Sequence, residues 1–181
     1  QPGTVVSEWE GPTDWVLALE RPALNLAAFV SGIATRTHNL VKIAHSAGLK
    51  HPPRITSTRK TLPGYRDLSI YGVITGGGHA HRVSLSGGVL IKENHIAAAG
   101  GIGSAVGGVR KLAPHGLGVE VEVRSLRELE QAIHCMVEGV LLDNFSPSQV
   151  EQALELIAKE AKLPVTVEVS GGIHEDNIRG Y

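Results

Sequence analysis

The chain has 181 residues, with 17 lysines and arginines against 18 aspartates and glutamates, and this length suffices for one well-buried core or for one domain with part of another. The net charge of −1 and the 4% of aromatic residues argue against nucleic-acid binding. No apolar run approaches the roughly 20 residues that span a bilayer and the amino terminus has no leader pattern, so we expect no membrane association and a cytoplasmic protein.

Residues 20–48 have the pattern of a long helix, with Pro22 expected in its first turn and Gly48 at its carboxyl end. Small residues in its middle would let another helix or a partner subunit approach closely: Ala27, Ala28, Ser31, Gly32 and Ala34. Residues 4–19 contain β-prone and turn-forming segments. We therefore expect residues 1–50 to be the remnant of a separate small domain together with its linking helix.

From residue 54 onward, short apolar runs alternate with helical patterns, which is typical of βα units and a parallel sheet. The expected strands are residues 54–57, 89–92, 119–123, 140–143 and 165–169. Ser125 with Glu128, and Ser146 with Gln149, form capping patterns ahead of two amphipathic helices. About five strands do not close a barrel, so we expect residues 51–181 to form a partial α/β barrel and the chain to be a fragment.

Cationic residues gather between Ser57 and His95, although the net charge is close to zero. They are Arg59, Lys60, Arg66, His79, His81, Arg82, Lys92 and His95. Arginine forks bind carboxylates at two points, and lysines are compact charges that suit phosphate or carboxylate. The cluster predicts a local anion site, and the alternative for the arginines is ion pairing with acids of neighbouring strands.

Polar residues also follow each of three expected strands. Glu122, Asp143 and Ser170 are about one βα unit apart, so in a βα barrel they fall on the rim where active sites occur. The two acids could hold Mg²⁺, contact ribose hydroxyls or stabilise positive charge on a sugar carbon, or simply pair with Arg or Lys. The backbone amides of Ser170, Gly171 and Gly172 could cradle a phosphate, or form only a glycine-rich turn.

Two other features have less specific interpretations. His79 and His81 have the spacing of two metal ligands, but Arg82 beside them would repel a cation, which favours an anion or ring-nitrogen contact for His81. Cys135 is the only cysteine, so no intrachain disulfide can form, and we expect it to be a buried small residue.

A series of motifs runs in order from Glu20 to the end of the chain. They read ERPALN, SGIAT, TRKTLPGYR, GGGHAHR, LIKENHI, VEVEV, LLDNF and EVSGGI. In this order they resemble the quinolinate phosphoribosyltransferase family. The resemblance implies an amino-terminal α/β sandwich joined to an incomplete α/β barrel, and a homodimer or a multiple of it. It also implies phosphoribosyl transfer from phosphoribosyl pyrophosphate to quinolinate with decarboxylation, giving nicotinate mononucleotide, pyrophosphate and CO₂ for NAD biosynthesis.

The resemblance further implies a role for each candidate residue. The residues that would bind quinolinate are Arg21, supplied across the dimer, and Arg59, His81, Arg82 and Lys92. Those that would meet phosphoribosyl pyrophosphate are Lys60, Glu122, Asp143, Ser170, Gly171 and Gly172. The catalytic set would be Lys60, Lys92, Glu122 and Asp143. Mg²⁺ would be held, directly or indirectly, by the two acids.

Three alternatives remain beside this interpretation. The first is a molybdenum-utilisation relative with the same fold, and the second is an inactive fragment that binds a dicarboxylate or only dimerises. The third is a metal-dependent hydrolase that uses His79 and His81. One residue departs from the family pattern, because Glu93 stands where the K-D-N-H motif usually has aspartate.

Overall fold

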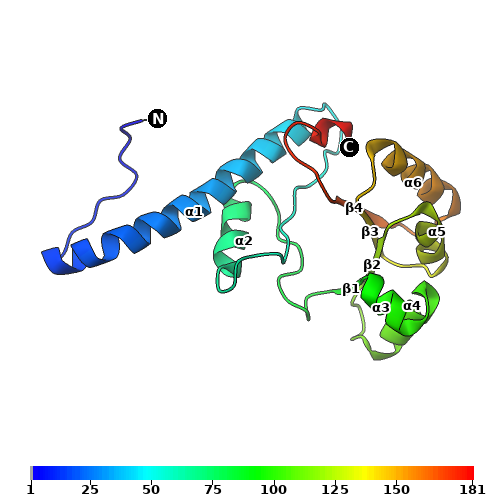
Figure 1. The fold of residues 1–181 in the computed structure, drawn as a ribbon. Helices are drawn as coiled ribbons and strands as arrows, with labels where there is room; N and C mark the ends of the chain where they lie inside the picture. Colours follow the sequence, from blue (N-terminus) through cyan, green and yellow to red (C-terminus); the bar gives the residue numbers. More distant parts are fainter. Residues whose placement is uncertain (1) are drawn as a thin grey trace. The chain divides into compact units, whose positions relative to one another are not determined.

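A computed structural model describes residues 2–181 (Figure 1), and their contacts divide the chain into two compact units. The first unit ends at His81 and the second comprises Arg82–Tyr181. The domain boundary expected near residue 50 stays a prediction, and residue 1 of that expected domain lies outside the described residues.

The first unit is built on a long helix, α1 (Thr13–His45). The helix begins seven residues earlier than predicted, so Pro22 lies inside it and not in its first turn. Residues 13–19, predicted as β-prone or turn-forming, are helical because apolar and alanine residues continue the helical pattern and Asp14 complements the helix dipole in the first turn. The carboxyl end is close to the prediction, with Ser46 as the capping residue and Gly48 in a left-handed conformation just beyond it.

A second helix, α2 (Arg66–Thr75), packs on α1 and was not predicted. A Cβ atom at Gly76 would lie 2.4 Å from the carbonyl oxygen of Ala34, and one at Gly72 would lie 3.0 Å from the Ile33 side chain. The close approach of α2 to α1 therefore depends on two glycines, Gly72 within α2 and Gly76 directly after it. The small-residue pattern in α1 predicted such a contact, and Ala34 makes it.

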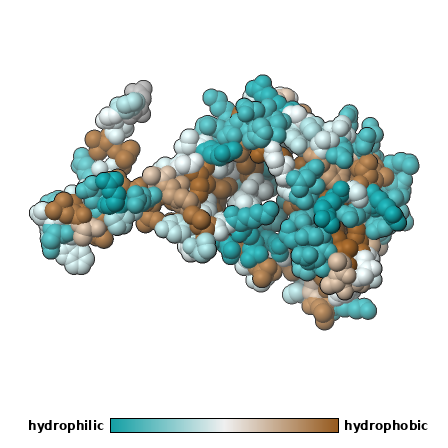
Figure 2. Space-filling model, in the orientation of Figure 1, coloured by the Kyte–Doolittle hydropathy of each residue, from teal (hydrophilic) through white to brown (hydrophobic). Residues whose placement is uncertain are grey.

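Helix α1 corrects the expectation that no segment has the length and apolar character of a membrane span. It has 33 residues, and an 18-residue stretch of it has a mean hydropathy of 1.3. Large apolar side chains are exposed along it: Trp15, Leu17, Leu19, Leu24 and Leu26. Figure 2 shows brown, hydrophobic patches on the surface of this helix. One such helix is weak evidence for a membrane segment, because helices of soluble proteins can have the same length and composition.

The second unit contains a parallel sheet of four strands in chain order. They are β1 (Val89–Ile91), β2 (Val119–Val123), β3 (Gly139–Asp143) and β4 (Thr166–Ser170). All four agree with predicted strands to within one residue at each end. The predicted strand at residues 54–57, in the first unit, is wrong: only Thr56 forms a bridge, with His79, because the chain leaves the pairing after Ser57.

Helices connect the strands of the second unit and pack on one face of the sheet (Figure 1). They are α3 (Glu93–Ala99), α4 (Ile102–Leu112), α5 (Leu126–His134) and α6 (Pro147–Glu160), followed by the short 3₁₀ helix η1 (Ile178–Gly180). Strands that neighbour one another in chain order, each followed by a helix, form an arc of an α/β barrel. The fold class predicted from the sequence is confirmed.

The hydrophobic core of this unit lies between the sheet and its helices. Alternate residues of β2, at Val119, Val121 and Val123, are fully buried against a layer that includes Leu129 of α5. Cys135 is half-buried at the end of α5 and packs against this core. Because side chains alternate along a strand, the intervening residues of β2 project from the opposite face, which carries the acidic residues.

Candidate functional site

The candidate site of the second unit is the edge of the sheet where the parallel strands end. Lys92 directly follows β1, Glu122 lies one residue before the end of β2, and Asp143 and Ser170 are the last residues of β3 and β4. The register pairs Asp143 with Ser170 across the two strands. The prediction that polar residues of successive strands share one rim is confirmed.

Lys92 and Glu122 form an ion pair between the ends of β1 and β2. The Glu122 side chain is 10% exposed and that of Lys92 is 37% exposed, so the carboxylate is largely shielded from water and the lysine side chain remains partly exposed. The Lys92 backbone N–H donates to Nδ1 of His95 at 2.9 Å, which caps the start of α3 and fixes the turn that carries Lys92. Glu122 therefore holds an ammonium group in place at the strand ends.

Glu93 adds a second carboxylate to this corner. Its pKa is lowered from the ordinary value of 4.5, first by a hydrogen bond from its own backbone and then by a side-chain hydrogen bond with Glu122 and the positive charges of Lys92 and Arg124. Burial acts in the opposite direction. The departure from the usual aspartate therefore places a longer acidic side chain beside the Lys92–Glu122 pair.

Asp143 and Ser170 interact across β3 and β4. The Ser170 hydroxyl donates to Oδ1 of Asp143 at 3.2 Å, and the chain then turns at Gly171 and Gly172, which both have positive φ angles of 96° and 65°. A positive φ suits glycine, so this turn requires the two glycines predicted to matter. The turn thus begins at a serine whose side chain is hydrogen-bonded to an aspartate of the neighbouring strand β3.

The arginines of the predicted anion site have buried donor atoms. In the second unit, Nη1 of Arg82 donates to the carbonyl oxygen of Gly88 at 3.3 Å. Its Nε atom is buried and, within residues 2–181, has no hydrogen-bond partner, and the same holds in the first unit for Nε of Arg59 and of Arg66. A buried guanidinium N–H without a partner costs free energy unless a ligand accepts a hydrogen bond from it, so these donors fit anion binding better than structural ion pairing.

In the first unit, the bridge between Thr56 and His79 organises the segment that ends at His81. The Ser57 hydroxyl accepts the His81 backbone N–H at 3.1 Å. Lys60 lines a hollow of about 300 Å³ that Thr58, Thr61 and other residues around α2 also line. Arg21 is exposed on α1 and lines a second hollow, of about 490 Å³, with Phe29, Leu62, Tyr65 and neighbours of Arg21 on α1.

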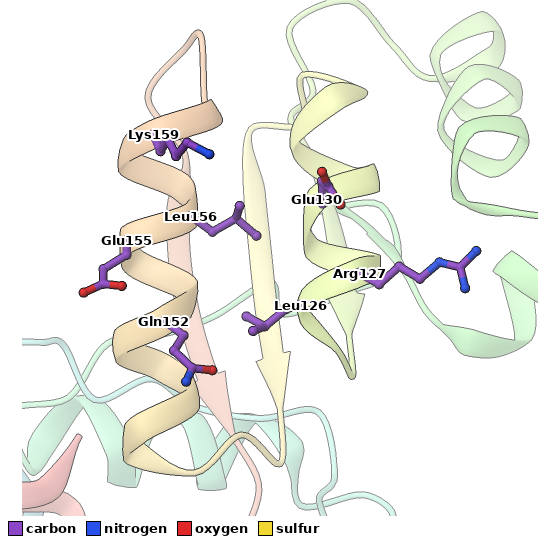
Figure 3. A pocket seen from close by; sticks show the side chains of 7 residues that line it. All are labelled: Leu126, Arg127, Glu130, Gln152, Glu155, Leu156 and Lys159. Atoms are coloured by element: carbon purple, nitrogen blue, oxygen red, sulfur yellow. The ribbon is translucent and has the colours of Figure 1, made fainter.

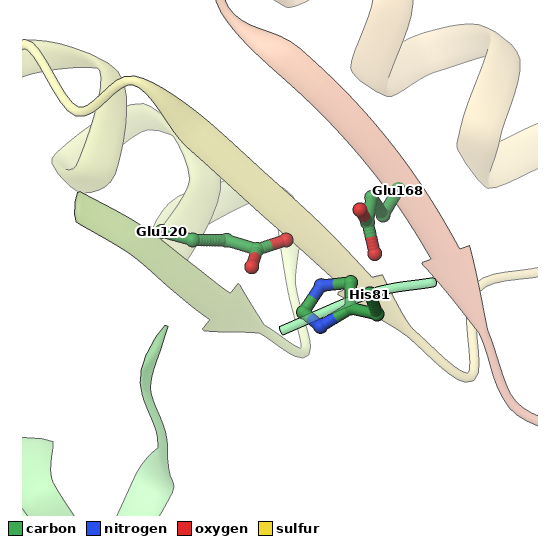
Figure 4. A group of neighbouring side chains, drawn as sticks. All are labelled: His81, Glu120 and Glu168. Atoms are coloured by element: carbon green, nitrogen blue, oxygen red, sulfur yellow. The ribbon is translucent and has the colours of Figure 1, made fainter. Parts of the chain in front are cut away.

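Two further acids lie on the same face of the sheet. Figure 4 shows Glu120 and Glu168 projecting from β2 and β4 with β3 between them. One carboxylate oxygen of each lies within 4.8 Å of the other. Gly139 of β3 leaves room for this approach, because a Cβ there would lie 3.3 Å from Cγ of Glu120. Glu120 is two residues before Glu122, so of the two only Glu122 reaches the strand ends, as the alternation predicted.

A hollow of about 490 Å³ on the helical layer contains none of the predicted residues. It lies between α5 and α6, and Figure 3 shows Leu126 and Leu156 at its centre with charged side chains around them. The helices cover the face of the sheet opposite the acids. We therefore assign the site to the strand ends and not to this hollow.

Sequence reasoning missed two residues that shape the site. His95 was grouped with the cations, whereas its ring accepts a backbone hydrogen bond at the start of α3. Asn144 follows Asp143 with a φ of 58°, and no role was predicted for it beyond its place in the LLDNF motif. An asparagine directly after a strand-end aspartate is a usable signal, because asparagine tolerates the left-handed conformation better than most residues.

Known proteins with similar sequences identify the family of this chain. Residues 33–181 match the family described as quinolinate phosphoribosyl transferase, C-terminal domain. A probable carboxylating nicotinate-nucleotide pyrophosphorylase of Methanocaldococcus jannaschii is 42% identical over 179 residues, which are 97% of this chain and 62% of that protein. The Homo sapiens carboxylating nicotinate-nucleotide pyrophosphorylase is 42% identical over 174 residues, 96% of this chain and 57% of that protein.

Solved structures give the same result. The nicotinate-nucleotide pyrophosphorylase from Francisella tularensis superposes with a TM-score of 0.80 at 40% identity, covering 93% of this chain and 57% of that one. The enzyme of the same name from Ehrlichia chaffeensis gives 0.81 at 35% identity, covering 91% and 57%. The chain thus spans about three fifths of the length of these relatives. By sequence and fold, the chain belongs to the quinolinate phosphoribosyl transferase family.

Proposed function

We propose that the chain carries the site for phosphoribosyl transfer from phosphoribosyl pyrophosphate to quinolinate, followed by decarboxylation to nicotinate mononucleotide. The observation that carries this proposal is the row of strand ends in which the Lys92–Glu122 pair adjoins the Asp143–Ser170 pair and a glycine turn. The row offers an ammonium group, two acids and backbone amides to one substrate pair. The names of the related enzymes agree with this chemistry.

Quinolinate carries two carboxylates, and its recognition calls for several cations. In the second unit, we assign this role to Arg82 and Lys92, because Arg82 has a buried unpaired Nε and Glu122 holds the ammonium group of Lys92. Arg59 of the first unit also has a buried Nε atom with no hydrogen-bond partner among the described residues. His81 and, from a partner subunit, Arg21 complete the proposed set, as the family resemblance implies.

Phosphoribosyl pyrophosphate presents phosphates and ribose hydroxyls. We assign its 5-phosphate to the amides of the turn formed by Ser170, Gly171 and Gly172, since glycines allow a backbone to approach a phosphate closely. Asp143 and Glu122 have carboxylate oxygens that suit ribose hydroxyls. Lys60, which is exposed beside its hollow, suits the pyrophosphate.

Mg²⁺ is the metal that this substrate implies, and the two proposed acids fit it unequally. Mg²⁺ prefers oxygen ligands and binds through one or two carboxylates with retained water. Asp143 accepts one hydrogen bond from Ser170 and keeps its other carboxylate oxygen for this purpose, whereas Glu122 is already engaged by Lys92. Asp143 is therefore the better ligand, and a bound Mg²⁺ would supply charge neutralisation on the pyrophosphate.

The proposed reaction requires little general acid or base catalysis by the protein's side chains. The bond from the sugar carbon to pyrophosphate breaks as the ring nitrogen of quinolinate bonds to that carbon, and positive charge develops on the sugar, where Glu122 and Asp143 can stabilise it. The 2-carboxylate then leaves as CO₂, the electron pair stays on the ring carbon beside the positive nitrogen, and a proton replaces the carboxylate. Lys92 and Arg82 orient the carboxylates.

We also propose that the chain acts as a homodimer or a multiple of it, in the cytoplasm. The support is the exposed small-residue face of α1 at Ala27, Ala28, Ser31 and Gly32, where a Cβ on Gly32 would meet nothing within 4 Å. Such a face allows close approach of another helix. Analytical ultracentrifugation at several concentrations tests the proposed homodimer, and a monomer at every concentration would count against it.

A turnover assay tests the activity. The chain is incubated with phosphoribosyl pyrophosphate, Mg²⁺ and quinolinate labelled at the 2-carboxyl group, and mononucleotide and labelled CO₂ are measured. We expect equal amounts of the two products, and loss of both in Arg82→Met. Arg127→Met, in the hollow on the helical layer, is the matched control and should keep the parent rate. Equal rates in all three proteins would contradict the assignment.

A further inference from the structure

Two asparagines flank the turn at Ser170, Gly171 and Gly172. Asn144 directly follows β3, and its backbone N–H donates to the Ser170 carbonyl oxygen at 2.8 Å. Its φ of 58° is a left-handed conformation, which among the described non-glycine residues only Met136 shares. The unusual backbone at Asn144 therefore extends the β3–β4 pairing by one hydrogen bond and brings its side chain to the turn.

The side chain of Asn144 lies directly against Gly171. A Cβ atom added to Gly171 would be 2.2 Å from Oδ1 and 2.6 Å from Cγ of Asn144. The amide group of Asn144 thus fills the space that a side chain at Gly171 would need. Because Gly171 has a φ of 96° and no side chain of its own, this contact limits its conformational freedom.

Asn177 holds the turn from its other end. Its Nδ2 donates to the Gly172 carbonyl oxygen at 2.8 Å, and its Oδ1 accepts the backbone N–H of His174 at 2.8 Å. Asn177 comes just before the 3₁₀ helix η1. One asparagine therefore restrains Gly171 by contact, and the other restrains Gly172 by a hydrogen bond.

We infer that Asn144 and Asn177 are positioning residues that hold this turn in the shape that binds a phosphate monoester. The inference rests on the proposed function only in taking the turn as the phosphate site. Two adjacent glycines have more backbone freedom than any other pair of residues, and ordering them at the moment of binding would weaken affinity. The two asparagines order them before the ligand binds.

The first test needs no ligand. Asn144→Gly keeps the left-handed backbone at no steric cost and removes only the side chain. The backbone order parameters of Gly171 and Gly172 are measured by ¹⁵N relaxation in the parent and in this variant. We expect them to fall from roughly 0.85 to below about 0.6. Met136→Gly, the same change at the other left-handed residue, lies before β3 and should leave both values unchanged.

The second test measures ligand affinity by calorimetry with ribose 5-phosphate as the probe. We expect Asn144→Gly and Asn177→Ala each to weaken its binding about tenfold, from the ordering cost of the turn. Affinity for quinolinate should stay at the parent value, whereas a merely structural defect would weaken the binding of both ligands.

Each outcome decides a separate point. Unchanged order parameters in Asn144→Gly would overturn the restraint, whatever the ligand does. Lower order parameters with unchanged affinity for ribose 5-phosphate would overturn the positioning role. A parent chain that does not bind ribose 5-phosphate would refute both the inference and the proposed phosphate site, even where the relaxation data show that the asparagines restrain the turn.

Discussion

The Lys92–Glu122 ion pair predicts an asymmetric response to removal of either partner. Lys92→Met leaves the Glu122 carboxylate, which is 10% exposed, without its cation. Breaking a buried pair costs about 3–5 kcal/mol and an exposed pair about 0.2–1 kcal/mol. Because the Lys92 side chain is 37% exposed, solvent screening places this pair between the two cases, and we expect a loss of roughly 1–3 kcal/mol.

Glu122→Gln should cost less, about 1 kcal/mol or below, because the ammonium group left behind can still reach water. The double variant should be more stable than Lys92→Met alone, since it no longer contains an uncompensated carboxylate. Lys159→Met is the matched control: its pair with Glu160 has a lysine side chain that is 79% exposed, and we expect a change within about 0.5 kcal/mol.

The assay is urea denaturation followed by circular dichroism, with the free energy of unfolding extrapolated to water for each protein. The reasoning would be refuted if Lys92→Met were no more destabilising than Lys159→Met. It would also be refuted if the double variant lost the full sum of the two single changes, because the partners would then be energetically independent.

Three other predictions concern particular residues. Gly76→Ala should destabilise the first unit by about 1–3 kcal/mol, because the new Cβ would lie 2.4 Å from the Ala34 carbonyl oxygen; thermal melting measures this, with Gly32→Ala, which meets nothing within 4 Å, as the control. Ser146→Ala should cost about 0.5–2 kcal/mol in urea denaturation, because the hydroxyl accepts the Gln149 backbone N–H at 3.3 Å and caps α6; an unchanged free energy of unfolding would contradict the cap. The pKa of Glu93 is lowered from 4.5, so Glu93 stabilises the fold above about pH 4.5 and loses this contribution as the pH falls through the lowered pKa. Denaturation of Glu93→Gln across pH 3–7 should therefore show a smaller fall in stability at acid pH than the parent, and identical profiles would contradict it.

The second unit was predictable from the sequence because its signals are local. The alternation in Val119–Val123 and the capping serines at 125 and 146 each specify an element through neighbouring residues. The strand ends then follow from the rule that parallel strands place their carboxyl ends at one edge. Glu122, Asp143 and Ser170 were located correctly for this reason.

The first unit was less predictable because its structure depends on contacts distant in the sequence. The pattern around Pro22 suggested a helix start, whereas the preceding residues continue the helix and accommodate the proline inside it. Helix α2 contains β-branched residues and a glycine, and its packing on α1 compensates for that weak propensity. The Lys92–Glu122 ion pair and the contact between the Asn144 side chain and Gly171 likewise join residues that are distant in the sequence, so no single segment encodes them.

Calorimetric titration of quinolinate into the chain, with nicotinate as the comparison, tests the central claim most directly. The two compounds share the pyridine ring and differ by the 2-carboxylate, so the proposed contacts with Arg82 and Lys92 should distinguish them. The account predicts saturable binding of quinolinate, no measurable binding of nicotinate, and loss of quinolinate binding in Arg82→Met. Equal binding of both compounds, or quinolinate binding that survives in Arg82→Met, would contradict it.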